Sequence, residues 1–278
     1  MLLVALVFME KNQGLYQKGN MSRILFYILI PVVIWSNAMA EETYLTTSEM
    51  KLKGHVRTSL DSPKPTHEQL ERKEKFSKLV ASLNVPVLDS LPVVEDSSQI
   101  TPRTKESISK RAIAIALAAV KGEGLSHKEV IELVEEWGVI SYFTKDELNF
   151  INNPNPTNRE RVKFAWRYEG LDVLLWALGY KDKLPKPNKI CDVKTDISII
   201  KKQNNFRSLV KNSKIRNISE ILDMADYYYR LHWAAIELRL KGEKIDSINE
   251  EIIMERHYAL NWLIRYMNQN WDDISTDT

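Results

Sequence analysis

The sequence predicts an all-α protein, with a single helical domain over residues 66–278 and at most one or two short extended segments near residues 85–95. Two observations carry this prediction: helix-start signals recur along the domain, and apolar residues follow them at helical spacing. The signal is the capping box, in which a Ser or Thr side chain accepts a backbone N–H and a Glu or Gln three positions later reaches back. The boxes are Thr66/Gln69, Ser126/Glu129, Thr144/Glu147, Thr157/Glu160 and Ser247/Glu250, with Asn217/Glu220 as a variant. Thr101 before Pro102 is a further cap, with proline at the first helical position.

The amino-terminal part of the chain has the pattern of a secretory signal peptide over residues 21–40. Arg23 supplies a positive charge, residues 24–35 are apolar, and an A-M-A tripeptide ends at Ala40. Twelve helical residues span about 18 Å, which is short of the roughly 30 Å hydrocarbon core of a bilayer. We therefore interpret residues 1–20 as a non-native upstream extension, and we predict export to the periplasm or beyond, cleavage after Ala40 and no stable membrane span afterwards. The alternative is an uncleaved amino-terminal helix that anchors the protein.

The segments outside the predicted helices are short. Residues 41–65 are polar and end in S-P-K-P, which predicts a flexible leader. Residues 85–95 alternate in polarity and contain two prolines, which predicts an extended segment or an edge strand. Residues 152–156 and 181–189 are predicted loops, and a domain boundary at 181–195 is the alternative to a single domain.

Composition and charge exclude several classes of protein. Hydrophobic residues make up 44% and charged residues 27%, which is typical of globular proteins and excludes a disordered or multi-span membrane protein. The net charge is +2 for the whole chain and zero after cleavage behind Ala40, so no electrostatic footprint for nucleic acid is present. The single cysteine, Cys191, excludes an internal disulfide framework, and we interpret it as structural because no base is identified beside it.

The predicted helix over residues 157–180 is apolar on nearly all sides, which is typical of a central helix. Two apolar stripes run along it: Phe164, Tyr168, Leu171, Leu175 and Leu178, and Val162, Trp166, Val173 and Trp176. Arg167 and Glu169 lie among these residues, and an unpaired buried charge costs several kcal/mol. We therefore expect both to have partners on other helices.

Two later helices repeat this pattern of an apolar stripe interrupted by an ionisable residue. In the predicted helix over residues 219–241, His232 shares a stripe with Ile221, Ala225, Tyr228 and Ala235. In the helix that starts near Ser247, His257 shares a stripe with Ile253, Leu260, Ile264 and Met267. Arg256 shares the adjoining stripe with Ile252, Ala259, Leu263 and Tyr266. Three helices are thus predicted to turn ionisable groups toward one interior.

Two accounts of these interior groups remain open. In the first, they form a buried network in which Glu169 pairs with Arg256 or Arg167 and the imidazoles bond to carbonyls or a tyrosine. In the second, they line one pocket, and Glu169, His232 and His257 are candidate catalytic residues. A carboxylate can act there as a general base and a histidine as an acid or base, while Arg167 and Arg256 bind an anion.

The carboxy-terminal stretch W-D-D-I-S-T-D-T has two interpretations. Its charges favour a solvated tail, but Trp271 gives it a side chain to bury. If the tail folds back, Asp272 or Asp273 is predicted to bind Arg167 or Arg256. These two aspartates and two arginines are therefore the candidate binding residues.

We predict no metal site and no cofactor. The interior histidines lie on different helices without H-E-x-x-H spacing, and the chain has no Walker, G-x-G-x-x-G or G-x-S-x-G motif. The tyrosine run at residues 227–229 and the tryptophans either line a ligand groove or belong to the core.

Several stretches carry a resemblance to a known family: VKFAWRYEGLDVLLWALGY (162–180), DYYYRLHWAAIELRLKG (226–242), MERHYALNWLIRY (254–266), WDDISTDT (271–278), LPVVED (91–96), RTKESISKRAIAIAL (103–117) and LPKPNKICDV (184–193). Together they resemble the bacterial family catalogued as domain of unknown function 4272, over about residues 70–278. The resemblance implies no particular activity, substrate or catalytic residue. The signal peptide departs from the family pattern.

From these observations we expect a non-catalytic binding or interaction protein of the cell envelope, with a protein as one candidate partner and nucleic acid excluded. One alternative is a hydrolase-like enzyme that uses Glu169 with His232 or His257. Another is an immunity-type or structural partner protein. A solvent-reachable concavity at the interior groups would favour the enzyme, and a large exposed apolar patch would favour the partner protein.

Overall fold

The computed structural model describes residues 64–278. This part of the chain contains nine α-helices and no strand, so the all-α prediction is confirmed. The helices are α3 (His67–Ala81), α4 (Lys105–Glu123), α5 (His127–Trp137), α6 (Lys145–Asn152), α7 (Asn158–Ala177), α8 (Val193–Gln203), α9 (Phe206–Asn212), α10 (Ile218–Lys241) and α11 (Glu250–Leu263). The predicted upstream extension, signal peptide and all but the last two residues of the leader lie outside the described residues.

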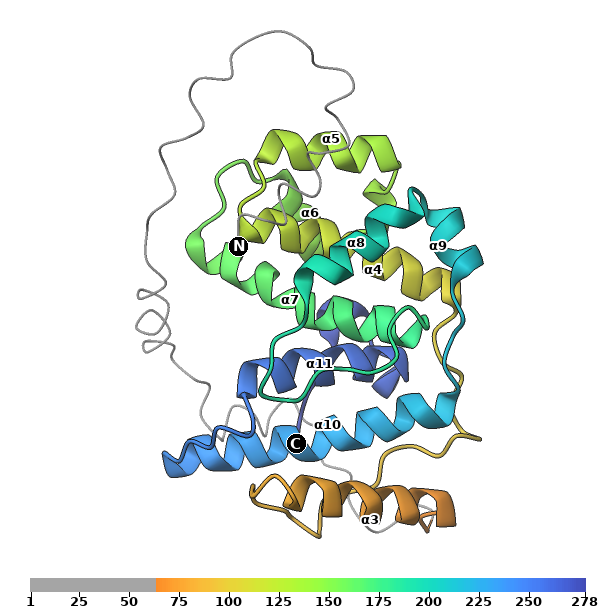
Figure 1. The fold of residues 1–278 in the computed structure, drawn as a ribbon, viewed down its shortest axis with the longest axis vertical. Helices are drawn as coiled ribbons and strands as arrows, with labels where there is room; N and C mark the ends of the chain where they lie inside the picture. The colour runs from red at the N-terminus through yellow and green to blue at the C-terminus, as the bar shows by residue number, and fades with distance from the viewer. Residues whose placement is uncertain (1–63) are drawn as a thin grey trace, which may run out of the picture. The chain divides into compact units, whose positions relative to one another are not determined.

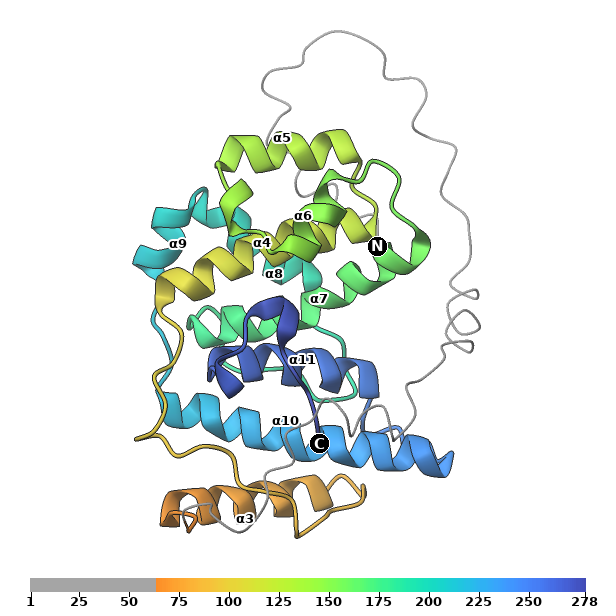
Figure 2. The ribbon, with the colours of Figure 1, turned by 180° about the vertical axis from the view of Figure 1, so that it is seen from behind.

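The helices stack in the order α3, α10, α11, α7 and α4, with α5 and α6 beyond α4 (Figures 1 and 2). Helices α8 and α9 pack beside α7 and α4. The most extensive pairing joins α4 to α7. At their closest approach, a Cβ on Gly122 would lie 2.6 Å from the Arg161 carbonyl oxygen and 2.7 Å from the Ala165 nitrogen. The absence of a side chain at Gly122 is therefore what lets these two backbones approach.

Four capping boxes form as predicted, at Thr66, Ser126, Thr144 and Thr157. Each is a local arrangement of four residues, so its sequence signal is sufficient. Asn217 also caps its helix, but its side chain accepts the N–H of Ser219 and no box with Glu220 is present among its contacts.

Two predicted helix starts are wrong. Helix α4 begins after Thr104 and not after Thr101, because the backbone N–H of Arg103 donates to the Leu263 carbonyl. Helix α11 begins after Asn249 and not after Ser247, because the backbone N–H of Asn249 donates to the Pro187 carbonyl. In both cases a tertiary contact takes the group that the cap would have used.

Of the two alternatives for residues 85–95, the edge strand does not form. This segment is irregular, because side chains from α3 and α10 bind the carbonyls that a neighbouring strand would need. These bonds are Lys73 to Asp89 and Leu91, Gln69 to Val94, Arg72 to Glu95, and Arg230 to Pro92.

The apolar stripes of α7, α10 and α11 are buried, except that Val162, Trp166 and Tyr266 are half-buried and Met267 is exposed. Met267 is 54% exposed, which contradicts the prediction that it continues the α11 stripe. The helix ends at Leu263, and Arg265, Met267 and Asn268 then adopt left-handed φ values of 56°, 50° and 54°. No helix within residues 64–278 has the length and apolar character needed to cross a bilayer.

Candidate functional site

A buried ion pair joins Glu169 of α7 to Arg256 of α11. The Oε2 atom of Glu169 lies 2.7 Å from Nη2 and 2.9 Å from Nε of Arg256. Both residues are almost fully buried, at 2% and 0% exposure. The structure thus confirms the pairing of Glu169 with Arg256, one of the two partners that the sequence allowed.

The same pair fixes the loop that runs over residues 181–191. Arg256 donates from Nη1 to the carbonyl of Pro185 (2.8 Å) and from Nη2 to that of Lys189 (2.9 Å). The second carboxylate oxygen of Glu169 accepts the backbone N–H of Cys191 at 2.8 Å. These interior charges therefore act on main-chain atoms of the loop and hold it at Pro185, Lys189 and Cys191.

Arg256 also donates from Nη1 to the hydroxyl of Tyr228 at 2.8 Å. Burial alone would lower the pKa of Arg256, but Tyr228 and Glu169 outweigh it and hold that pKa above its ordinary value. The guanidinium is therefore a permanent cation behind the loop.

A second group of charges holds the start of the loop. The ammonium of Lys181 bonds to the buried carboxylates of Asp172 and Asp196. Arg216 donates from Nη2 to the carbonyls of Lys181 (2.6 Å) and Asp182 (2.8 Å). Burial, with Asp172 nearby, raises the pKa of Asp196 to about 7 in spite of Lys181. The loop is thus bonded at both ends to buried or half-buried side chains.

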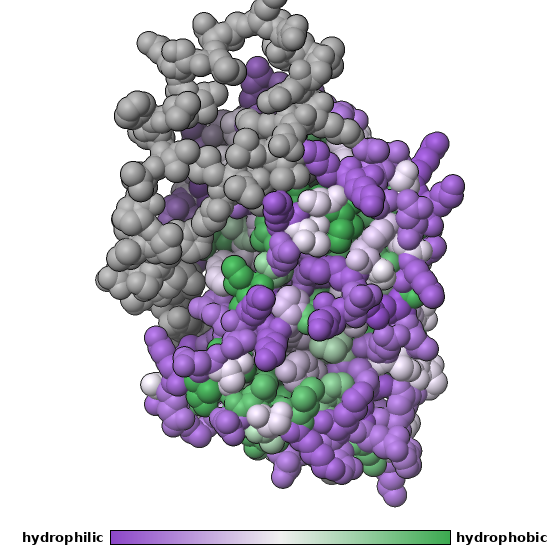
Figure 3. All heavy atoms as spheres, in the orientation of Figure 1, coloured by the Kyte–Doolittle hydropathy of each residue, from purple (hydrophilic) through white to green (hydrophobic). Residues whose placement is uncertain are grey.

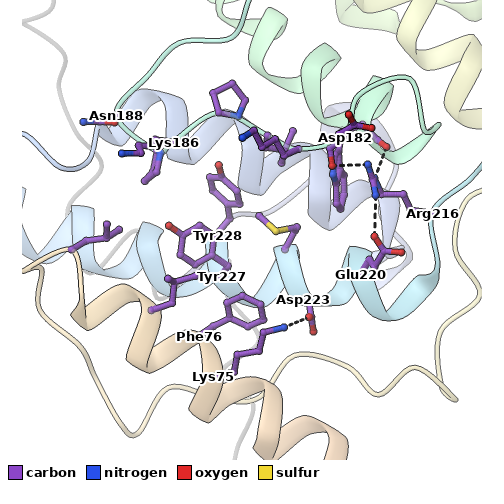
Figure 4. Close-up of a pocket in the computed structure, with 18 of the residues that line it drawn as sticks. Lys75, Phe76, Asp182, Lys186, Asn188, Arg216, Glu220, Asp223, Tyr227 and Tyr228 are labelled. Atoms are coloured by element: carbon purple, nitrogen blue, oxygen red, sulfur yellow. Dashed lines mark hydrogen bonds and ion pairs between the residues drawn. The ribbon is translucent and has the colours of Figure 1, made fainter.

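The loop forms one wall of a groove of about 610 Å³, whose other walls are α3 and α10 (Figure 4). Its apolar lining consists of Phe76, Leu79, Leu83, Trp176, Leu184, Pro185, Pro187, Met224, Tyr227 and Tyr228. In Figure 4, Tyr228 points from α10 toward the loop, with Tyr227 and Phe76 on the α3 side. Figure 3 shows hydrophobic side chains gathered on the lower part of this face, where Figure 1 shows α3 and α10.

The charged residues of the groove are only partly matched. Lys75 pairs with Asp223 at 2.6 Å, and Arg216 pairs with Glu220 at 2.9 Å. Lys183 and Lys186 on the loop make no ion pair within the described residues. The hydroxyl of Tyr227 makes no hydrogen bond there either, and burial raises its pKa to about 12. Asp182, which also lines the groove, makes no ion pair in the described residues either, so the groove offers two unmatched cations, one unmatched carboxylate and one free hydroxyl.

The catalytic candidates lie behind this groove and not on its surface. The Nδ1 atoms of His232 and His257 are 3.0 Å apart, and the two side chains are 4% and 2% exposed. Burial, followed by His232, lowers the pKa of His257 well below its ordinary value. Neither histidine, nor Glu169, is among the residues that line the groove. The structure pairs these groups, Glu169 with Arg256 and His232 with His257, and buries both pairs.

The candidate binding residues Arg167 and Asp272 have partners other than the predicted ones. Arg167 pairs with Glu255 at 3.0 Å, and its ring contacts are with Tyr258 and Trp271. The tail does fold back, since Trp271 is 4% exposed and its carbonyl accepts the Tyr258 hydroxyl. Asp272, however, accepts the backbone N–H of Asp146 at 3.2 Å.

The predicted contact of Asp272 or Asp273 with Arg167 or Arg256 is therefore replaced. Both arginines bond to carboxylates on neighbouring helices. Asp273 is exposed. The described residues also contain no group of three or more His, Cys, Asp or Glu side chains arranged to hold a metal ion.

Sequence reasoning missed Lys181, Asp196 and Arg216, which hold the loop. Lys181 and Arg216 lie outside the helices, where no periodicity marks a buried position. The usable signal was the proline-rich loop itself, since a loop whose ends lie between central helices needs donors for its carbonyls.

Comparison with known proteins agrees with the resemblance seen in the sequence. No curated protein and no solved structure matches the chain. The sequence model of one family, "Domain of unknown function (DUF4272)", matches residues 72–274, which include α7, α10, α11 and the loop between α7 and α8. The chain therefore belongs to the DUF4272 family, a domain of unknown function.

Proposed function

We propose that this protein is a non-catalytic binding protein of the cell envelope, and that the groove between α3, α10 and the 181–191 loop takes a small organic carboxylate with an apolar body. The observation that carries the proposal is a preformed wall: buried charges fix the loop before any ligand arrives. Preorganisation of this kind lowers the entropy that binding must overcome.

The aromatic residues that line the groove indicate that the ligand has an apolar part. Aromatic side chains at Phe76, Trp176 and Tyr227 give a ligand flat surfaces to pack on. A volume of about 610 Å³ suits a small molecule, since ligand pockets commonly range over roughly 300–1,000 Å³.

The lysines of the groove that make no ion pair in the described residues indicate that the ligand carries a carboxylate. Lys183 and Lys186 stand on the loop, and Tyr227, whose hydroxyl has no hydrogen-bond partner in the described residues, lines the same groove. Hydrogen bonds from an ammonium to a carboxylate are about twice as strong as neutral ones. Burial keeps the Tyr227 hydroxyl protonated, so it also serves as a donor.

The buried polar groups favour a binding role over hydrolysis, because they already bond to one another and to the backbone. A general base must come within hydrogen-bond reach of a substrate. Glu169 is instead saturated by Arg256 and the Cys191 N–H, and each histidine faces the other.

Calorimetry with the full chain tests the ligand class, using 3-phenylpropionate, its neutral amide and the corresponding amine. We expect the carboxylate to bind at least about tenfold more tightly than the amide, the loss of one charge-assisted hydrogen bond. Equal binding of the amide, stronger binding of the amine, or no saturation by any of the three would contradict the proposal.

Matched variants test the place of binding. Lys186→Gln should weaken binding of 3-phenylpropionate about tenfold, whereas Lys189→Gln, an exposed lysine on the same loop outside the groove, should not. Leu79→Gln should weaken it also, while Leu70→Gln, on the same helix but outside the groove, should leave it unchanged. Equal effects within a pair would place the ligand elsewhere.

Export is tested separately by amino-terminal sequencing of the protein recovered from the envelope fraction. We expect the mature chain to begin at Glu41, because cleavage behind small residues follows the apolar stretch. A chain that retains Met1 or Met21 would overturn the predicted cleavage.

A further inference from the structure

A second cavity, of about 640 Å³, lies where the starts of α4 and α6 meet the carboxy-terminal segment. It shares no lining residue with the groove. Its walls include two arginines, two tryptophans and three aspartates: Arg103, Arg111, Trp262, Trp271, Asp146, Asp272 and Asp273.

Two guanidinium groups line this cavity. Arg111 is 5% exposed and forms a buried ion pair with Glu147 through Nη2, in which the Arg111 Nε and the Glu147 Oε1 have no hydrogen-bond partner. Arg103 donates to the carbonyls of Trp262 (3.1 Å) and Gln269 (2.7 Å) but has no carboxylate partner in the described residues. A guanidinium without a carboxylate partner in a confined space, as at Arg103, is a site for an oxyanion.

Stacking fixes both guanidinium groups. The Arg103 guanidinium lies 4.7 Å from the ring centre of Trp262, and that of Arg111 lies 5.3 Å from Trp271. Trp262 and Trp271 in turn pack edge to face, with centroids 5.4 Å apart. The cations are thus held in place by an aromatic pair without being neutralised by it.

The rim of the cavity has mixed charge, with aspartates exposed to solvent. Asp272 accepts the N–H of Asp146, whose own carboxylate lies 3.4 Å from Lys163. Asp273 is exposed and makes no ion pair in the described residues. Lys145 adds a cation to the rim. The aspartates would repel an inorganic anion, but they would attract an ammonium group carried by the same molecule as the oxyanion.

We propose that this cavity binds a zwitterion of the α-amino acid class. The carboxylate lies against Arg103 and Arg111, and the ammonium group lies toward Asp272 and Asp273. Three observations support this assignment: the Arg103 guanidinium without a carboxylate partner in the described residues, the carboxylates at the rim, and a volume that suits one amino acid with its side chain.

Calorimetry on the full chain tests this assignment with glycine, leucine, lysine and glutamate, followed by the N-acetyl and amide derivatives of whichever binds best. We expect saturable binding of at least one amino acid, and at least about a tenfold loss when either charge is removed. Equal binding of the N-acetyl form would show an anion site only, and equal binding of the amide a cation site only. No saturation by any of the four at millimolar concentration would also overturn the proposal.

A matched pair of variants locates the ammonium group. Asp273→Asn removes an exposed charge that no structural contact needs, so folding should be intact while affinity for the amino acid falls about tenfold. Glu136→Gln, an exposed carboxylate on α5 away from the cavity, should leave affinity unchanged. If Asp273→Asn binds as well as the unmodified protein, the ammonium group does not lie at this rim.

Discussion

Arg256 is fully buried and bonds at once to Glu169, to Tyr228 and to carbonyls of the loop. Breaking a buried pair by removing one partner is costly because the other charge stays desolvated. We predict that Arg256→Ala lowers the free energy of unfolding by about 3–5 kcal/mol, measured by urea denaturation.

The control for this prediction is Lys128→Ala, which breaks an exposed pair with Glu132. Exposed pairs contribute little, so this variant should unfold at nearly the same urea concentration as the unmodified protein. If Arg256→Ala behaved like Lys128→Ala, the Glu169 carboxylate would have to be hydrated in the folded protein.

Cys191 is buried at the end of the loop, and burial raises the pKa of its thiol, with Glu169 and Asp196 adding to the effect. Because the thiolate is the reactive form, we predict very slow alkylation of the native protein by iodoacetamide and fast alkylation in urea. The measurement is the mass of the protein over time. Similar rates in both conditions would show that the loop opens readily.

At the scale of helices, the α4–α7 contact depends on Gly122. A methyl group there would meet backbone atoms of α7 at 2.6 and 2.7 Å, and backbone cannot rotate away as a side chain can. We predict that Gly122→Ala lowers the free energy of unfolding by about 1–3 kcal/mol, the usual range for overpacking. Thermal and urea unfolding both report this quantity.

Gly170 in α7 provides the matched comparison. A Cβ there would lie 3.7 Å from Ala259 and Trp271, an ordinary contact distance. Because alanine favours a helix over glycine by up to about 1 kcal/mol, Gly170→Ala should be neutral or stabilising. Loss of stability in Gly170→Ala, or none in Gly122→Ala, would contradict the packing described for these helices.

At the scale of the whole molecule, stability should fall in acid. His257 has a pKa well below its ordinary value of 6.5 because it is buried beside His232. The unfolded chain therefore takes up a proton below pH 6.5 that the folded protein does not, and folding stability decreases as the pH falls. Its contribution is complete above pH 6.5 and is lost toward the lower folded pKa.

A difference measurement isolates this effect. Asp196, whose raised pKa removes stability as the pH rises toward about 7, acts in the opposite direction but is common to both proteins compared. Between pH 6.5 and about pH 5, the unmodified protein should lose about 1–2 kcal/mol more stability than His257→Phe. Parallel pH profiles would mean that His257 titrates normally.

The sequence predicted what is local or periodic. The boxes at Thr66, Ser126, Thr144 and Thr157 need only neighbouring residues, and they form. The starts at Thr101 and Ser247 fail because the carbonyls of distant residues, Leu263 and Pro187, accept the backbone N–H groups that a cap would bind. No pattern within a helix reports such a contact.

For the candidate site, periodicity identified Glu169 and Arg256 as interior and allowed their pairing. It placed the histidines correctly inside but could not show that they face one another. The groove could not be predicted from the sequence for a different reason. One of its walls is an irregular loop, and the sequence does not distinguish Lys186 on that wall from other surface lysines. Tyr227 lay in a run that periodicity alone assigned equally to core or groove.

The bonds from Arg256 and Arg216 to the loop end on carbonyl oxygens of Pro185, Lys189 and Asp182. A hydrogen bond to a main-chain carbonyl does not depend on which side chain that residue carries. Residues 183 and 186 can therefore vary between family members while the loop keeps its path, and ligand selectivity can change without loss of folding. We expect members of the family to bind different ligands and to share the buried arginine bonds that hold the loop.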